Sequence, residues 1–418
     1  MKQIVIIADD LTGACDTGIK FRRLGLKTKV LVDPWSCPPL DADPVPVISI
    51  NTDTRSAGPA EAKAAVADLL RQLRGRGDFL YYKKVDSVLR GNIVSELEAL
   101  FQELRPNFAL IAPAFPATGR WLRDGLLRIG NKVHPTLEID ALALLSSGTE
   151  RKCGHIDLDT VRRGPEAVTE KTEALYREGA TLILADTWCE SDLKILSQVV
   201  PHFGSRCLPV GSAGLANHLA QQFCVSNPAD AGTGPAQSPP DGALVVVVGS
   251  RHPVTVEQVQ RLKEAVPLET YLLPVGGIDQ SNLQERVEQV FAQRTPAEGS
   301  RQILLTTDFI YNSSDNCRHL LQQNAYNQAI LDGISLCAEA LAKAVPIRGM
   351  IVTGGDIASE ILGRLKLNRI DLMDEPIPGI VTGQATDNSG KGFLLATKSG
   401  GFGEPAALLE LYEYMRLS

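Results

Sequence analysis

The sequence predicts a two-domain α/β protein in which each domain is a mostly parallel sheet covered by helices, with a cleft between the domains. Short apolar runs typical of buried strands alternate with amphipathic segments along both halves of the chain, and this order favours parallel, helix-covered sheets. The length of 418 residues exceeds what one hydrophobic core usually serves. A stretch rich in Pro, Gly, Ser and Ala separates the halves. We therefore expect an N-terminal domain over residues 1–224, a linker over 225–242 and a C-terminal domain over 243–418.

The expected elements follow this alternation in order. A first strand over 4–8 leads into an amphipathic helix that opens at Thr12-Gly13 and stops at Gly25. Further apolar runs in the first half predict strands over 27–33, 45–51, 79–83, 108–112 and 181–185, with helices over 60–74 and 92–104. In the second half we expect strands over 243–249, 270–274, 302–307, 349–353 and 393–398, and helices over 255–265, 283–293, 328–344 and 357–365. The segment 255–258 is also a candidate capping box at a helix start.

Composition excludes several classes of function. The net charge of -7 argues against nonspecific nucleic-acid binding, which requires a basic surface. No stretch approaches eighteen uncharged apolar residues and the N-terminus lacks a signal-peptide pattern, so we expect no membrane partner and a cytoplasmic location. The eight cysteines are scattered without C-x-x-C spacing, which favours reduced thiols over a zinc site or disulfides.

Two consecutive carboxylates, Asp9 and Asp10, follow the first predicted strand. In open α/β sheets, ligands bind at the carboxyl ends of the strands, beside the helix N-termini that follow. Two acids at such a point cost solvation energy and repel each other. One of them has an alternative role as the cap of the next helix, but capping accounts for one carboxylate at most. The pair therefore predicts a functional site.

Charged side chains also follow the next strands. Arg55 lies after the strand over 45–51, and Lys83, Lys84, Asp86 and Arg90 lie at the end of the strand over 79–83. Such a set suits a small anionic polyol, because the cations pair a carboxylate, with Arg55 as a bidentate clamp, and the acid accepts a hydroxyl. The alternative is a surface loop whose charges compensate one another. Three successive strand ends with such residues favour a convergent site.

The second half carries glycine-rich turns after its strands, at 249–250, 353–356 and 398–403. Glycines let backbone N–H groups approach phosphate oxygens, so the turns predict a nucleotide site, with Asp356 available to hold a metal and its water shell. Tight packing turns are the alternative. A P-loop and a Rossmann fingerprint are both absent from the sequence. In the first half, 113–120 could line the site or only turn the chain, and the lone His155 is more often structural than catalytic.

These motifs together resemble the four-carbon acid sugar kinase family. The matching blocks occur in the family's order over nearly the whole chain, at 7–16, 51–55, 83–92, 113–120, 211–216, 249–250, 353–356 and 398–403. The resemblance implies an acid-sugar-binding N-terminal domain and an ATP-binding C-terminal domain. It also implies substrate contacts at Asp10, Arg55, Lys83, Lys84, Val85 and Asp86, and nucleotide contacts at Ser250, Gly354, Gly355, Asp356, Gly400 and Gly401.

The family implies ATP-dependent phosphorylation of a tetronate, for which we expect D-threonate and its 4-hydroxyl, with Mg²⁺ beside ATP. D-erythronate, 3-oxo-tetronate and L-threonate remain alternatives, as does a non-catalytic two-lobe sugar-acid sensor. Asp10 is the first candidate for the general base and Asp86 the second. The chain departs from the family pattern at Val88, Arg251-His252 and Ile357. The expected partners are the sugar acid and ATP, and homo-oligomer formation is left open.

Overall fold

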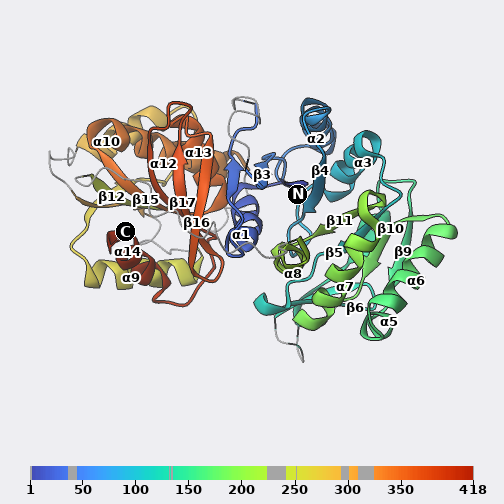
Figure 1. Ribbon diagram of the computed structural model, residues 1–418. Coiled ribbons are helices and arrows are strands. Elements are labelled where there is room, and N and C mark those ends of the chain that lie inside the picture. The colour runs from blue at the N-terminus through green and yellow to red at the C-terminus, as the bar shows by residue number, and fades with distance from the viewer. Residues whose placement is uncertain are drawn as a thin grey trace. The chain divides into compact units, whose positions relative to one another are not determined.

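The computed structural model describes residues 2–35, 45–130, 132, 135–223, 242–250, 252–292, 301–308 and 324–417 (Figure 1). The chain divides into two compact units, one comprising Met1–Pro34 and Pro38–Gly232, the other Trp35–Cys37 and Thr233–Ser418. Of the segment predicted as a linker, only Gly242 lies among the described residues. Each unit combines a β-sheet with packed helices, so the two-domain α/β fold expected from the sequence is confirmed.

The large sheet of the first unit has the strand order β2-β3-β1-β4-β11-β5-β10-β9. All the pairings between these strands are parallel. The strands are β1 (Gln3–Ala8), β2 (Thr28–Leu31), β3 (Val47–Asn51), β4 (Phe79–Lys84), β5 (Phe108–Ala112), β9 (Lys152–Ile156), β10 (Ala180–Ala185) and β11 (Cys207–Gly211). Because β1 lies between β3 and β4 and runs parallel to both, the carboxyl ends of these three strands are neighbours.

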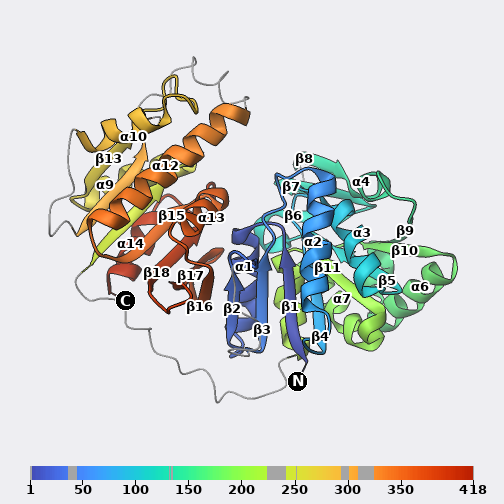
Figure 2. The same cartoon turned by 90° about the horizontal axis from the view of Figure 1, so that it is seen from above.

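Helices of this unit pack on the sheet through apolar faces. They are α1 (Leu11–Arg22), α2 (Pro59–Leu73), α3 (Ile93–Leu104), α4 (Ala141–Ser146), α5 (Leu158–Arg162), α6 (Pro165–Arg177), α7 (Glu190–Phe203) and α8 (Ala213–Phe223). Helices α2 and α3 lie side by side (Figure 2). The core includes the buried Ile4, Ile6, Phe21 and Tyr82. Burial of such side chains stabilises the fold by about 1.5–3 kcal/mol for each aliphatic or Phe side chain.

A small antiparallel sheet, which the sequence analysis did not predict, adds to the first unit. It comprises β6 (Arg120–Arg123), β7 (Leu126–Gly130) and β8 (Pro135–Asp140). The β6–β7 turn is Asp124-Gly125, with positive φ values of 55° and 73°. Asp-Gly is a preferred pair for two-residue hairpins because both positions need left-handed backbone.

The sheet of the second unit has the strand order β13-β14-β12-β15-β18-β17-β16. It is parallel from β13 to β18, whereas β17 is antiparallel to both β18 and β16. Its strands are β12 (Ala243–Val248), β13 (Glu269–Leu273), β14 (Gln302–Thr307), β15 (Ile347–Thr353), β16 (Arg369–Ile377), β17 (Ile380–Thr386) and β18 (Gly392–Lys398). The described helices are α9 (Pro253–Ala265), α10 (Leu283–Ala292), α12 (Asn324–Ala344), α13 (Gly355–Arg364) and α14 (Ala407–Leu417). Among the described residues, no helix has the length and apolar character needed to cross a membrane.

Candidate active site

Asp9, Asp10 and Arg55 form a compact ionic cluster at the carboxyl ends of β1 and β3. The Arg55 guanidinium donates from Nε and Nη2 to the two Asp9 oxygens at 2.9 and 2.8 Å. It also donates from Nη1 and Nη2 to the two Asp10 oxygens at 2.6 and 2.8 Å. Asp10 is the N-cap of α1, since its Oδ1 accepts from the Gly13 amide at 2.9 Å. Both sequence interpretations of Asp10, helix cap and member of a charged site, therefore hold together.

Asp86 joins this cluster from the end of β4. Its Oδ1 lies 3.9 Å from Arg55 Nη2, and Arg90 donates from Nε to Asp86 Oδ2 at 2.8 Å and from Nη2 to Oδ1 at 3.0 Å. Arg90 itself is largely exposed. Asn92 donates from its side-chain amide to the carbonyls of Thr54 and Ala57 at 2.8 and 2.9 Å, which fixes the loop that carries Arg55. The structure thus brings together Asp10, Arg55, Asp86 and Arg90 as the sequence predicted.

The carboxylates of the cluster have different electrostatic environments. Burial raises the pKa of Asp10 above its usual value, and the charge of Asp9 adds to the rise against the opposing effects of Arg55 and Lys84. For Asp9 and Asp86 burial acts in the same direction, but hydrogen bonds from Arg55 and Arg90 outweigh it, so their pKa values are lowered. Two carboxyl groups with opposite pKa shifts typically divide the roles of proton acceptor and permanent anion. Here Asp10 fits the proton acceptor and Asp86 the permanent anion.

Lys84 is a buried cation in the middle of the cluster. Its side chain is only 5% exposed, and within the described part of the chain its ammonium forms no hydrogen bond or ion pair. It interacts over longer distances with the charges of Asp10 and Asp86. A side chain at Gly13 would place its Cβ 2.7 Å from Lys84 Nζ, so the glycine leaves room for this ammonium against α1. A buried ammonium without a bonded partner is suited to an anionic ligand.

Lys83 and Val85 are buried inside the domain. Their positions do not fit the direct substrate contacts expected for them. The Lys83 side chain is 0% exposed, and its ammonium pairs with Glu96 Oε2 of α3 at 2.7 Å. Glu96 also accepts a short hydrogen bond from Thr54. Val85 is 1% exposed, and its amide donates to the Gly211 carbonyl at 2.9 Å. Successive residues of a strand point to opposite faces, which explains why Lys84 reaches the cluster and Lys83 does not.

In the second unit, the three glycine turns predicted from the sequence follow the adjacent strands β12, β15 and β18. A Cβ at Gly400 would lie 2.5 Å from Ser250 Oγ, and a Cβ at Gly401 would lie 3.1 Å from the His252 ring. Gly354 has a positive φ of 109°, and its amide donates to the Lys398 carbonyl at 2.8 Å. The turns therefore lie together at the carboxyl ends of these adjacent parallel strands.

Two polar residues of α9 hold the third turn. Thr255 donates a short hydrogen bond to the Gly400 carbonyl, and the Gln258 amide donates to the carbonyls of Phe402, Gly403 and Glu404 at 3.1, 3.2 and 2.8 Å. The capping box expected at 255–258 is wrong, because α9 begins at Pro253 and its N-cap is His252. The pattern was visible in the sequence, but these side chains bind residues about 145 positions away, as in the Thr255–Gly400 bond.

Asp356 lies exposed on the first turn of α13. No group of three or more His, Cys, Asp or Glu side chains in the described residues could hold a metal ion. Mg²⁺ commonly uses one or two carboxylates together with substrate phosphates and water, and an exposed Asp356 beside the glycine turns fits that pattern.

His155 has a structural environment. Its Nε2 lies 2.8 Å from Oδ1 of the buried Asp186, which accepts the Asp124 and Gly125 amides at 2.8 and 3.1 Å. The hydrogen bond that His155 donates to Asp186 raises the pKa of His155. The pair thus secures the β6–β7 turn.

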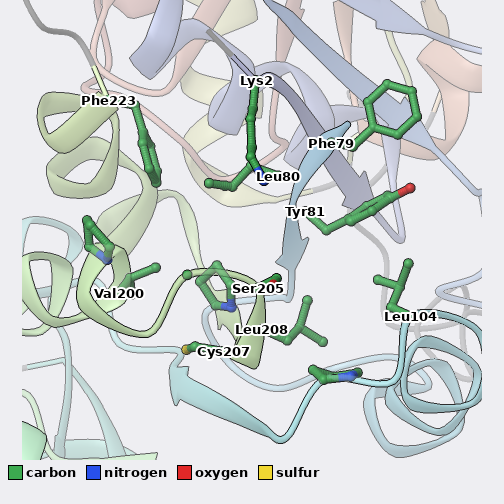
Figure 3. A pocket seen from close by; sticks show the side chains of 14 residues that line it. Lys2, Phe79, Leu80, Tyr81, Leu104, Val200, Ser205, Cys207, Leu208 and Phe223 are labelled. Carbon is green, nitrogen blue, oxygen red and sulfur yellow. The ribbon is translucent and has the colours of Figure 1, made fainter. Parts of the chain in front are cut away.

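A separate hollow of about 320 Å³ opens in the first unit. Figure 3 shows its mainly apolar lining, including Phe79, Tyr81, Leu208 and Phe223. Phe79 is the first residue of β4, whereas Lys84 and Asp86 lie at the other end of that strand. The hollow therefore lies at the amino end of β4, whereas the charged cluster lies at its carboxyl end, and the hollow contributes nothing to the cluster.

The comparisons with known proteins agree with this division of the chain. Residues 4–219 match the family described as a sugar-binding N-terminal domain, and residues 245–408 match the family described as a nucleotide-binding C-terminal domain. Fold and sequence thus define a two-domain protein whose halves match a sugar-binding and a nucleotide-binding family. The chain belongs to the four-carbon acid sugar kinase family.

Relatives span nearly the full chain. The D-threonate kinase of Bordetella bronchiseptica is 29% identical over 99% of this chain and 97% of its own length. The D-erythronate kinase of Heliobacterium modesticaldum is 26% identical, again over 99% and 97%. The 3-oxo-tetronate kinase of Methylobacterium radiotolerans is 28% identical over 95% of each chain. A crystal structure from Salmonella typhimurium LT2 shares the fold with a TM-score of 0.77 and 24% identity, over 99% of this chain and all of the other.

Proposed function

We propose that this protein is a kinase that transfers a phosphoryl group from ATP to a four-carbon sugar acid. The observation that carries the proposal is the buried Lys84 ammonium, which lacks a bonded partner in the described residues and lies in one cluster with Asp10 and Asp86. A cation for a carboxylate and an acid for a hydroxyl are the two features that a sugar acid requires. Membership of the family and the names of the relatives, all tetronate kinases, support the same class of substrate.

The acceptor is bound in the first unit in this proposal. Lys84 and the exposed end of Arg90 pair the substrate carboxylate, while Arg55 holds Asp10 and Asp86 in place. Asp10 accepts the proton of the attacking hydroxyl, for which its raised pKa is suited. We favour D-threonate and its 4-hydroxyl, with 4-phosphate as the product. D-erythronate and 3-oxo-tetronate are the substrates named for other relatives.

The donor is bound in the second unit in this proposal. The turns that contain Ser250, Gly354 and Gly400 offer backbone N–H groups to the ATP phosphates, as the matching nucleotide-binding family supports. Mg²⁺ accompanies ATP and neutralises phosphate charge, with Asp356 as its protein carboxylate. Phosphoryl transfer depends mainly on positioning and charge neutralisation, so no covalent intermediate is required. A cytoplasmic location stays a prediction from the sequence, and homo-oligomer formation stays open.

Release of ADP that depends on the sugar acid tests the proposal. The panel contains D-threonate, L-threonate, D-erythronate and 3-oxo-tetronate, with neutral threitol as the matched control. We expect turnover with at least one tetronate and a kcat/KM for threitol lower by about tenfold or more, because buried cations left unpaired are costly. Comparable kcat/KM for threitol and threonate would contradict the carboxylate anchor. Binding of a tetronate without any ADP release would instead support a non-catalytic sensor.

A further inference from the structure

Lys398 is a fully buried lysine at the glycine turns of the second unit. It is the last residue of β18, which lies between β15 and β17, and its side chain is 0% exposed. Its ammonium donates to the carbonyl oxygens of Ser399 at 3.2 Å and Gly400 at 2.9 Å. In the sequence this lysine is visible only as the first residue of the motif at 398–403.

No carboxylate lies within ion-pair distance of Lys398 in the described part of the chain. The titratable groups on the adjoining turns are His252, Asp356 and Glu404, and none of them pairs with it. Burial lowers the pKa of Lys398 to about 8. Because a buried charge without a counter-ion opposes folding, an apolar side chain would serve the fold better. A role in binding an anion explains why a lysine stands at this position.

The two carbonyls that Lys398 holds determine where the next amides point. In a planar trans peptide the C=O and the following N–H point in opposite directions. The Ser399 and Gly400 carbonyls face the ammonium, so the N–H groups of Gly400 and Gly401 face away from it. Neither N–H donates to an acceptor in the described residues. Two adjacent N–H groups without acceptors are able to bind an anion together.

We propose that Lys398 is a positioning residue that orients the Gly400 and Gly401 amides toward a phosphate group of the bound nucleotide. The phosphate then lies across the two peptide groups from the ammonium, so that each charge meets the end of the peptide dipoles that attracts it. This inference rests on the proposed function, which identifies the anion as the polyphosphate of ATP or ADP. Lys398 thereby acts through the turn, and its effect is specific for the phosphate portion of the ligand.

The test compares Lys398→Met with wild type, and uses Lys391→Met, at the exposed residue that precedes β18, as the matched control. Calorimetry measures the affinity for ADP and for adenosine, steady-state kinetics measure KM for ATP, and a thermal melt reports stability. In Lys398→Met, Gly400 still accepts from Thr255 and Ser399 still accepts from the Phe402 amide. No carbonyl loses its last partner, so we expect an unchanged or higher Tm.

We expect the affinity of Lys398→Met for ADP to fall by about tenfold or more, since the charge-assisted hydrogen bonds that orient the Gly400 and Gly401 amides toward the phosphate are lost. The KM for ATP should rise, and adenosine affinity should stay at the wild-type level. A folded Lys398→Met that binds ADP as tightly as wild type would overturn the inference, as would an equal loss of adenosine affinity. If this variant does not fold, Thr255→Val removes the other donor to the Gly400 carbonyl, and the same loss of ADP affinity is required of it.

The failure of the proposed function has a different signature. In that case wild-type protein neither binds ADP nor releases it in a tetronate-dependent reaction. Inorganic triphosphate then tests Lys398 directly: the anion site requires binding to wild type and at least about tenfold weaker binding to Lys398→Met. Equal affinities, or no binding to either protein, would reject the role of Lys398.

Discussion

Replacing Lys83 should damage stability far more than substrate recognition. Lys83 and Glu96 form an ion pair of 2.7 Å with side-chain exposures of 0% and 1%. Lys83→Met leaves the Glu96 carboxylate buried without its cation. Breaking a buried pair by removal of one partner costs about 3–5 kcal/mol. For a unit of this size, that loss lowers Tm by roughly 6–20 °C.

Removal of both charges should restore most of the stability. In Lys83→Met/Glu96→Leu no buried charge is left, and Thr54 keeps a hydrogen bond to Thr52 with 2.8 Å between their hydroxyl oxygens. Hydrophobic replacement of a whole buried pair is often neutral or stabilising. The double variant should therefore melt close to wild type, and a double-mutant cycle with Lys83→Met and Glu96→Leu measures the coupling.

Thermal melts and denaturant unfolding provide the stabilities, and the tetronate KM of each folded variant provides the second readout. The exposed Lys63→Met on α2 serves as the control for loss of a lysine charge. We expect the double variant to keep the tetronate KM within a few-fold of wild type. Wild-type stability in Lys83→Met would refute the energetic reasoning. A large rise in KM in a stable double variant would show that Lys83 contacts the substrate after all.

Three further outcomes are expected. Asp10→Asn should lower kcat by about 10²–10⁴-fold with unchanged ADP affinity, as for a lost general base; full turnover would transfer that role to Asp86. Gly355→Val should weaken ADP binding and spare tetronate binding in calorimetry, because the added side chain obstructs the turn proposed to bind phosphate, and Gly355 has no positive φ that would strain the backbone of the variant; an unchanged ADP affinity in a stable variant would remove this turn from the site. ADP affinity should fall as pH rises through about 8, since Lys398 binds its proton with a pKa of about 8 in the free protein and a phosphate would raise that pKa. Calorimetry at several pH values should show at most about a tenfold loss for each pH unit and a flatter profile in Lys398→Met; equal profiles would exclude Lys398 as the source.

The fold was largely predictable because its signal is local. The strands over 108–112 and 302–307 were predicted residue for residue, and most of the other predicted elements differ from the structure by one or two residues at their ends. The missed strands carry weaker signals. Strand β16 contains Asp371, Asp374 and Glu375, so it lacks an apolar run. Asp124-Gly125 is a turn signal for the β6–β7 hairpin, but the strands on both sides of it are short, so the hairpin was not predicted.

The charged residues of the site were predictable because each follows a strand, and parallel strands bring their carboxyl ends together. Their individual roles were not predictable. Lys83 and Lys84 are neighbours and look equivalent in the sequence. Because successive strand residues point to opposite faces of the sheet, Lys83 pairs with Glu96 and Lys84 reaches the charged cluster. Glu96 itself gives no signal, because an acid on an amphipathic helix normally faces water.

The same distinction explains the two buried lysines that matter most for ligand binding. Lys84 and Lys398 are both almost inaccessible, and neither forms an ion pair in the described residues. Lys83, equally buried, has Glu96 as its counter-ion. Folding alone favours the arrangement of Lys83 or an apolar side chain, since an unpaired buried charge is destabilising. An anionic ligand reverses that balance, because it compensates the charge only when bound. Lys398 is therefore the position at which stability and ligand binding should respond to mutation in opposite directions, whereas the Lys84 ammonium is already stabilised in the free protein by the nearby charges of Asp9, Asp10 and Asp86.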